Sequence, residues 1–277
     1  MSQEQPQIPE PAPEGQNAES ILYSVEKRVG TITLNRPDKM NSLRFSEFEL
    51  INKYLNEADL DPKVHCIRIK SMGERVFCAG LDLNMVASLK PEDLKTLLSH
   101  GNQSVRQLIR TKKPIVMQIQ GPAVGWGCIA SMAADFIFVG DNPKSFFQLP
   151  EFDVGIYPAT GALTMALQNF PLKIAKKMFF MSYKISLDEM ERLGLLAGRA
   201  PLDKLDEECF KFCRDMAKRS PAIAYLTKAV MNNIYMGNLE DCFRLEAEAT
   251  ELTKSSEEGP WHEFVKKIWN KTPQFEP

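Results

Sequence analysis

The chain has 277 residues, enough for one large domain or for one domain with an appendage. Apolar residues make up 44% and charged residues 25%, a composition that excludes collagen, a membrane bundle and a wholly disordered chain. The 34 basic and 36 acidic side chains give a net charge of −2, so bulk charge gives no reason to expect nucleic-acid binding. No apolar run in the sequence approaches the ~18 residues of a membrane-spanning helix, and we expect no membrane association.

Residues 1–19 contain four prolines, four glutamates and no lysine or arginine, which predicts a disordered acidic arm. This arm lacks the arginine-rich character of a mitochondrial transit peptide and the apolar core of a secretory signal. The final residues, QFEP, do not match a C-terminal peroxisomal signal. A cytoplasmic location is therefore the default expectation, and mitochondrion and peroxisome stay open as alternatives.

The first half of the folded chain reads as alternating strands and helices. Two β-rich runs, 21–27 and 29–35, surround Gly30 and predict a hairpin. Apolar residues at helical spacing predict a helix over 45–58, and a strand follows at 66–71. A long helix is predicted over 92–111, which ends before a proline.

The second half becomes increasingly helical. A strand at 115–121 leads through a glycine-containing loop into a short helix of small residues, and a further strand is predicted at 136–140. After Pro158 the pattern is almost wholly helical to Lys271, apart from loops such as 198–203 and 256–260. This order predicts an α/β or α+β fold. We divide it into a core of residues 20–200 and a helical C-terminal region of residues 201–277.

Two glycine-containing loops each follow a strand and open into a helix. They are Phe77–Leu83 (FCAGLDL) and Gly121–Cys128 (GPAVGWGC). The free N–H groups at two such helix starts, converging on one point, would form an oxyanion hole. Each loop taken alone is also consistent with an ordinary tight turn. A dinucleotide phosphate loop is a weaker alternative, because residues 125–127 lack the third glycine.

Glu151 lies in a largely apolar segment, between Phe146 and Val154. An acid among such neighbours can be desolvated, and desolvation raises the pKa of a carboxyl group toward the range useful for proton transfer. The alternative is an exposed loop acid. Asp153 shares a face with Glu151 only if the segment is a regular strand, and we expect it to be solvated or structural.

Six cysteines and three histidines are spread through the chain without a CxxC pair or a histidine cluster. Cys209 and Cys213 fall on one face of a predicted helix, but two ligands do not make a zinc site. We expect reduced, buried cysteines and no metal centre.

Taken together and in this order, these features resemble the crotonase (enoyl-CoA hydratase/isomerase) superfamily from about Ile21 to Phe275. The motifs that carry the resemblance are Asn35–Asn41 (NRPDKMN), FCAGLDL, GPAVGWGC, PEFDVGIYPATG, the helix Ser186–Leu195, and the closing residues Glu258, Gly259, Phe264, Lys267 and Pro273 to Phe275. The resemblance implies a spiral of ββα turns and a helical C-terminal region that forms a homotrimer or a hexamer. It also implies a coenzyme A thioester as substrate, with no prosthetic group.

By this resemblance the backbone N–H groups of Leu81 and Trp126 would form the oxyanion hole, and Glu151 would be the catalytic acid/base. Trp126 could also narrow the pocket, although packing is the simpler role for its side chain. The residues implied in substrate or coenzyme A binding are Ala79, Gly80, Leu81, Asp82, Leu83, Asn84, Gly125, Ile129 and Lys267. Many family members have a basic residue at the position of Asn84, and Lys267 could supply that charge instead.

The sequence departs from the family's hydratases at one catalytic position. Hydratases use two acids, and Ile129 stands where the first is expected, while dienoyl-CoA isomerases carry a further acid where Ala159 stands here. One candidate base remains, which favours a double-bond isomerase that shuttles a proton on Glu151. A hydratase or other lyase with a second polar group from Asp153, Tyr157 or Thr160 is the main alternative. A non-catalytic acyl-CoA-binding protein is the other.

Overall fold

The computed structural model describes residues 19–89 and 91–235, together with positions 238, 240, 241, 243, 244, 246 and 247. The expected acidic arm falls outside these residues except for Glu19, and so do Lys267 and the whole closing motif. Among the described residues, no helix combines the length and the apolar character that crossing a bilayer requires.

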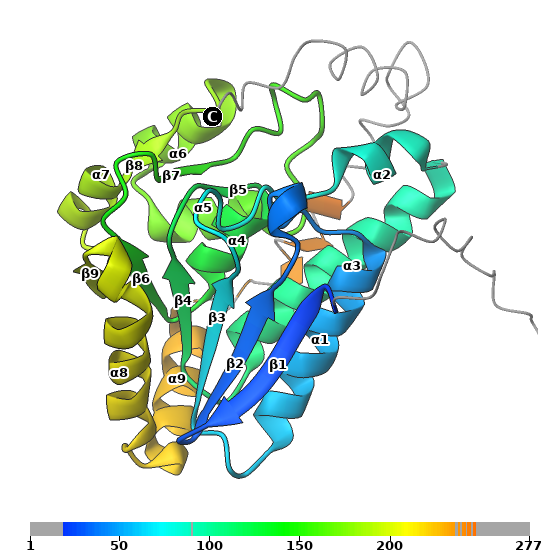
Figure 1. Ribbon diagram of the computed structural model, residues 1–277. Coiled ribbons are helices and arrows are strands. Elements are labelled where there is room, and N and C mark those ends of the chain that lie inside the picture. The colour runs from blue at the N-terminus through cyan, green and yellow to red at the C-terminus, as the bar shows by residue number, and fades with distance from the viewer. Residues whose placement is uncertain are drawn as a thin grey trace, which may run out of the picture.

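A six-stranded sheet forms the centre of the fold, with strand order β1-β2-β3-β4-β6-β9 (Figure 1). Only the β1–β2 pair is antiparallel, and the other four pairs are parallel. A small second sheet has the order β5-β7-β8. The strands are β1 (Ile21–Glu26), β2 (Val29–Leu34), β3 (Cys66–Ser71), β4 (Ile115–Ile119), β5 (Ala123–Val124), β6 (Phe136–Gly140), β7 (Phe146–Gln148), β8 (Ile185–Ser186) and β9 (Gly198–Ala200).

Helices cover both faces of the large sheet, with α1 and α3 side by side on one side and α8 on the other (Figure 1). The helices are α1 (Phe45–Leu60), α2 (Leu83–Ser88), α3 (Pro91–Arg110), α4 (Trp126–Ala133), α5 (Ala162–Asn169), α6 (Leu172–Phe180), α7 (Leu187–Arg192), α8 (Leu205–Ala217) and α9 (Pro221–Tyr235). Parallel strands covered in this way read as nearly continuous apolar runs.

Strand β3 illustrates how its side chains divide between the two layers. Ile67 and Ile69 pack into the main core, whereas Cys66 packs with Cys209 and Cys213 of α8. This alternation follows from the two-residue period of a strand. All three cysteines are free and buried, as the sequence led us to expect.

The first hairpin forms as predicted, but its turn lies earlier than Gly30. Lys27 and Arg28 connect the strands with φ angles of 47° and 69°. Two positive φ angles are typical of the type I′ turn that suits the twist of a hairpin. Gly30 instead lies inside β2, where an added Cβ would come 3.2 Å from Val64.

The α/β class predicted from the sequence is confirmed, and strands 66–71 and 136–140 have the predicted bounds. The predicted helices 45–58 and 92–111 correspond to α1 and α3. The prediction of a loop over 198–203 was wrong at its start, because residues 198–200 form β9 at the edge of the large sheet. A strand of three residues is too short to reveal a period in the sequence.

Candidate active site

The two glycine-containing loops follow β3 and β4 and lead into α2 and α4 (Figure 1). The strands are parallel neighbours, so both loops leave the same edge of the sheet. A β-bridge between Cys78 and Ala123 joins the loops directly, and Val124 N donates to Cys78 O at 2.9 Å. The fold therefore brings together two segments that lie more than 40 residues apart in the sequence.

Gly80 and Gly125 allow the two loop backbones to touch. Gly80 has a φ of +84°, and an added Cβ would lie 3.2 Å from Val124 O and 3.4 Å from Trp126 N. Gly125 has a φ of +53° and faces the Cα of Gly80. Both positions need the left-handed backbone that glycine adopts at little cost, and a side chain at Gly80 would push the loops apart.

The N–H groups of Leu81 and Trp126 lie at this contact. The neighbouring amides are occupied, because Asp82 N donates to Leu43 O and Gly125 N donates to Gln148 O. Within the described part of the chain, the N–H groups of Leu81 and Trp126 have no acceptor. Trp126 is also the first residue of α4, where the helix dipole is positive. The arrangement can polarise a carbonyl oxygen placed between them.

The indole of Trp126 packs in the core. Only 3% of the residue is exposed, Nε1 donates to Ser104 Oγ at 2.8 Å, and the ring meets Phe48 edge to face at 5.8 Å. The packing role expected for this side chain is confirmed. Its packing fixes the start of α4 and with it the direction of the Trp126 N–H.

Glu151 follows β7, which pairs with β5 next to the second loop. Its Oε2 is buried and has no hydrogen-bond partner among the described residues. Burial raises the pKa of Glu151 to about 7, and a bond from its own backbone N–H opposes that rise only in part. A carboxyl group with a pKa near neutrality is suited both to take and to return a proton.

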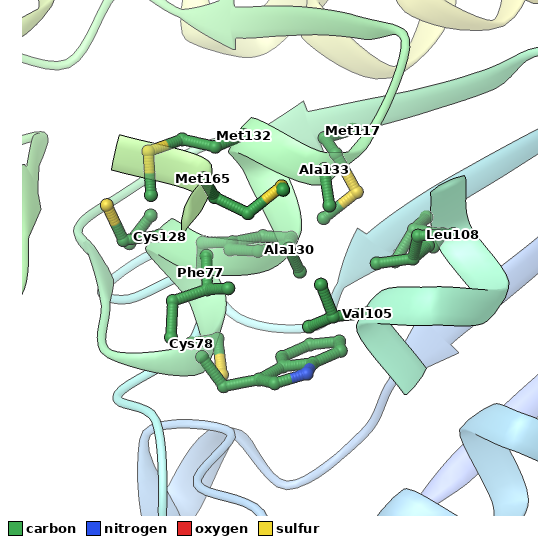
Figure 2. Close-up of a cluster of buried hydrophobic side chains, with 14 of the residues drawn as sticks. Phe77, Cys78, Val105, Leu108, Met117, Cys128, Ala130, Met132, Ala133 and Met165 are labelled. Atoms are coloured by element: carbon green, nitrogen blue, oxygen red, sulfur yellow. The ribbon is translucent and has the colours of Figure 1, made fainter. Parts of the chain in front are cut away.

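The carboxyl group of Glu151 lies near the first turn of α4. Burial raises the pKa of the Cys128 thiol, and the charge of Glu151 raises it further. Figure 2 shows Cys128 beside Met132, and Met165 nearby, in an apolar cluster behind the turn. Cys128, which feels the charge of Glu151, connects that carboxyl group to this apolar cluster.

The segment after Glu151 is a turn and not a strand. Asp153 N and Val154 N both donate to Pro150 O, and Ile156 N donates to Glu151 O at 2.8 Å. Asp153 is exposed, as expected for a solvated acid. Phe152 is 47% exposed and meets Phe180 edge to face, so this aromatic does not help to bury Glu151.

The side chain of Asp82 holds the first loop in place. Its Oδ1 accepts from Asn84 N and Met85 N and so caps α2, while Oδ2 pairs with Arg36 at 3.2 Å. Asp82 is 8% exposed, and its side chain is committed to these contacts. Ala79 and Leu83 are half-buried, and the side chain of Asn84 is exposed.

Ile129 lies in α4, is 2% exposed and donates its N–H to Gly125 O. No polar side chain occupies this position. Of the other polar candidates, Thr160 donates its hydroxyl to Ala159 O at 2.7 Å, and Tyr157 is half-buried. No cluster of three metal-ligating side chains occurs among the described residues.

Three residues that organise the site were not identified from the sequence. Arg36 lies in a quoted motif but had no assigned role, and the spacing of Ser104 in α3 gives no sign of its bond to Trp126. Glu246, which caps α5, comes from more than 80 residues away. No local pattern could have identified it.

Comparison with known proteins places this geometry in context. A family model described as enoyl-CoA hydratase/isomerase matches residues 24–275. A mitochondrial enoyl-CoA hydratase of Pongo abelii is 29% identical over 90% of this chain and 86% of its own. A crotonyl-CoA hydratase of Syntrophomonas wolfei is 26% identical over 87% of this chain and 93% of its own. A solved enoyl-CoA hydratase/isomerase from Xanthobacter autotrophicus shares the fold, with a TM-score of 0.81, 20% identity, and coverage of 94% and 100%.

Proposed function

The chain belongs to the enoyl-CoA hydratase/isomerase family, and from this premise we propose that it moves the double bond of an enoyl-CoA, with Glu151 as the proton shuttle. The observation that carries the proposal is the carboxyl group of Glu151 beside α4, with a buried, unpartnered Oε2 and a pKa near 7, in a site where Ile129 occupies the place of a second acid. Proton shuttling within one substrate needs no activated water. An apolar Ile129 helps to exclude water from the reaction.

The reaction is a proton transfer within the acyl chain. Ionised Glu151 takes a proton from C2 of a 3-enoyl-CoA, and the negative charge spreads onto the thioester oxygen. The N–H groups of Leu81 and Trp126 stabilise that oxygen, and each such donor contributes about 3–4 kcal/mol to transition-state stabilisation in comparable sites. The protonated carboxyl then returns the proton at C4, so that no co-reactant is consumed.

The substrate would lie along the two loops. In this proposal the substrate is lined by Ala79 to Asn84, Gly125 and Ile129. Asp82 would contact the substrate through its backbone, because its side chain is bonded to Asn84 N and Arg36. The proposed contact of Lys267 with coenzyme A falls outside the described residues.

A second candidate is the addition of water to a 2-enoyl-CoA. The names of the matched relatives support it, since both of those described above are hydratases. The weakness of this candidate is the second polar group, because Asp153 is exposed and the hydroxyl of Thr160 is already bonded to a carbonyl. Tyr157 is the remaining candidate for that group.

Two substrates separate these reactions. Purified protein is incubated with a 3-enoyl-CoA, where conjugation appears on isomerisation, and with a 2-enoyl-CoA, where conjugation is lost on hydration. We expect the Glu151→Gln variant to lose isomerisation by about a hundredfold or more, because general acid/base groups contribute on that order. The Asp153→Asn variant, which changes an exposed acid of the same turn, is the matched control.

Equal isomerisation rates in the parent and in Glu151→Gln would refute the proposal. Hydration that depends on Glu151 would establish the second candidate. Tight binding of acyl-CoA without either reaction would identify an acyl-CoA-binding protein, the third alternative.

Self-association as a homotrimer or hexamer is a further part of the proposal. Helix α9 exposes Ile223, Leu226 and Val230, which lie at helical spacing on one face, and also Met231. These side chains support burial of the C-terminal region against other copies of the chain. Light scattering on the purified protein would measure the assembly, and a monomer at micromolar concentration would contradict it.

A further inference from the structure

A buried carboxylate from the C-terminal region reaches the start of α5. Glu246 Oε2 accepts a hydrogen bond from Gly161 N at 2.8 Å, and Oε1 accepts from Thr164 N at 2.8 Å and from Thr164 Oγ1 at 2.6 Å. The residue is 5% exposed. Burial raises the pKa of Glu246, and these three donors oppose the rise by favouring the ionised form.

Helix α5 needs such a partner because its N-cap residue is glycine. Gly161 has a φ of 81° and no side chain that could accept from the first turn. Serine, threonine or aspartate normally fills this role from within the same segment. Glu246 supplies the missing acceptor from outside, and its negative charge suits the positive end of the helix dipole.

Phe243 completes the contact three residues earlier. It is 1% exposed, and a Cβ at Gly161 would lie 2.7 Å from its ring. The guanidinium of Arg106 lies 4.5 Å from the centre of the same ring. Phe243 and Glu246 therefore hold Gly161 between them, which explains why this position is a glycine.

The residue before Gly161 is strained. Thr160 has a φ of 58°, an unfavourable conformation that β-branched residues rarely adopt. It persists because its methyl group packs against Gly101 of α3, 2.8 Å from the position of an added Cβ. The turn formed by Thr160 and Gly161 is thus fixed by α3 on one side and by the C-terminal region on the other.

The same turn of α3 also holds the start of α4. Ser104 Oγ donates to Gly101 O at 2.7 Å and accepts from Trp126 Nε1 at 2.8 Å. Gly101, which contacts Thr160, and Ser104, which contacts Trp126, lie three residues apart on one helix. Helix α3 therefore positions both the turn at Thr160 and the start of α4.

We propose that Glu246 is a positioning residue for Glu151, one that fixes the downstream end of segment 151–161 by holding its final turn. The upstream end is already fixed, because Gly125 N donates to Gln148 O at 3.0 Å. With both ends held, the turn that carries Glu151 keeps its carboxyl group beside α4. The inference rests on the proposed function, because it assigns Glu246 a role in the geometry of that same reaction.

Two variants of Glu246 test the role. Glu246→Ala removes both acceptors and so loses the cap, and Glu246→Gln retains one carbonyl oxygen but turns an NH₂ group toward a backbone donor, so its cap is weakened. We expect kcat to fall about tenfold or more in both, because small displacements of a catalytic group have effects of that size. KM should change less than about twofold, since the loops that would bind coenzyme A are untouched.

The matched control is Glu240→Gln. Glu240 lies in the same segment, is exposed, and pairs with Arg106 and Arg110 at the surface. Loss of the Glu240 charge should leave kcat within about twofold of the parent value. Thr164→Val removes one of the three donors and should lower kcat in the same direction by less, so it serves as a further test should Glu246→Ala not fold.

A titration of Glu151 by NMR, with labelled glutamate carboxyl carbons, gives a readout without substrate. Loosening of the turn should admit water, so the pKa of Glu151 should fall from about 7 toward 4.5 in Glu246→Ala and stay unchanged in Glu240→Gln. Failure of the proposed function would give a different result: the parent would have no isomerase activity, or Glu151→Gln would keep that activity. A folded Glu246→Ala protein with lowered thermal stability but unchanged kcat and unchanged Glu151 pKa would overturn the inference.

Discussion

Arg36 and Asp82 form a buried ion pair, with Nη2 3.2 Å from Oδ2, that connects the segment after β2 to the loop after β3. Arg36 also donates to Ser42 O at 2.7 Å and lies 3.6 Å from the carboxylate of Glu47. Both members of the pair are less than a tenth exposed. Because Asp82 also caps α2, this pair sets the position of the Leu81 N–H from behind the loop.

Removing the arginine should cost much more stability than breaking a surface pair. Arg36→Met leaves the Asp82 carboxylate buried without its cationic partner, which costs about 3–5 kcal/mol in comparable cases, whereas Glu47 keeps its ion pair with Arg44. Lys218→Met, which breaks an exposed pair with Asp215, should have little effect on stability. Chemical denaturation measures both, and equal losses would contradict the structural role of the buried pair.

Gly80 offers a test of the contact between the two loops. In Gly80→Ala the alanine must adopt a φ of +84°, and its Cβ would lie 3.2 Å from Val124 O. The loops must therefore separate. Gly194→Ala is a matched control, because Gly194 has a φ of +70° but nothing within 4 Å of an added Cβ. Both should lose about 1 kcal/mol of stability from backbone strain. Only Gly80→Ala should lower kcat, by about tenfold to a hundredfold, as the two N–H groups move apart.

The elevated pKa of Glu151 predicts the pH dependence of the reaction. The base form is required for proton removal, so kcat/KM should fall below an inflection near pH 7 in the parent. Steady-state assays between pH 5 and pH 9 on a 3-enoyl-CoA would locate it. An inflection near 4.5, the ordinary value for this group, would mean that the carboxyl is hydrated in the free enzyme.

The sequence was sufficient for the long elements and for a candidate site, but not for the contacts that hold the candidate site in place. Strands such as β3 and helices such as α3 contain enough residues to reveal a period of 2 or 3.6. Glu151 and the two glycine loops were identified because their chemistry is local. The contacts of Glu246 with Gly161 and Thr164 are not local, and neither is the pair between Arg36 and Asp82. Such contacts depend on the completed fold, which no window of sequence encodes.

Glu151 should also make the folded protein less stable as pH rises. Its pKa is higher in the folded state, about 7, than the ordinary value of 4.5 expected on unfolding. The folded state therefore binds more protons between these two values, and the free energy of unfolding falls as pH rises through that window. A shift of this size corresponds to up to about 3 kcal/mol at pH 8.

Glu151→Gln removes this penalty, because the amide stays neutral at every pH. We expect the gain over the parent to be small near pH 5, just above the value of 4.5 expected on unfolding, and to reach up to about 3 kcal/mol at pH 8. Asp153→Asn, which removes an exposed carboxyl group of the same turn, should change stability equally at both pH values. Thermal or urea unfolding at pH 5 and pH 8 measures the difference. A Glu151→Gln protein without a gain at pH 8 would show that the charge of Glu151 is solvated in the folded state, which would remove the physical basis for its proposed role as a proton shuttle.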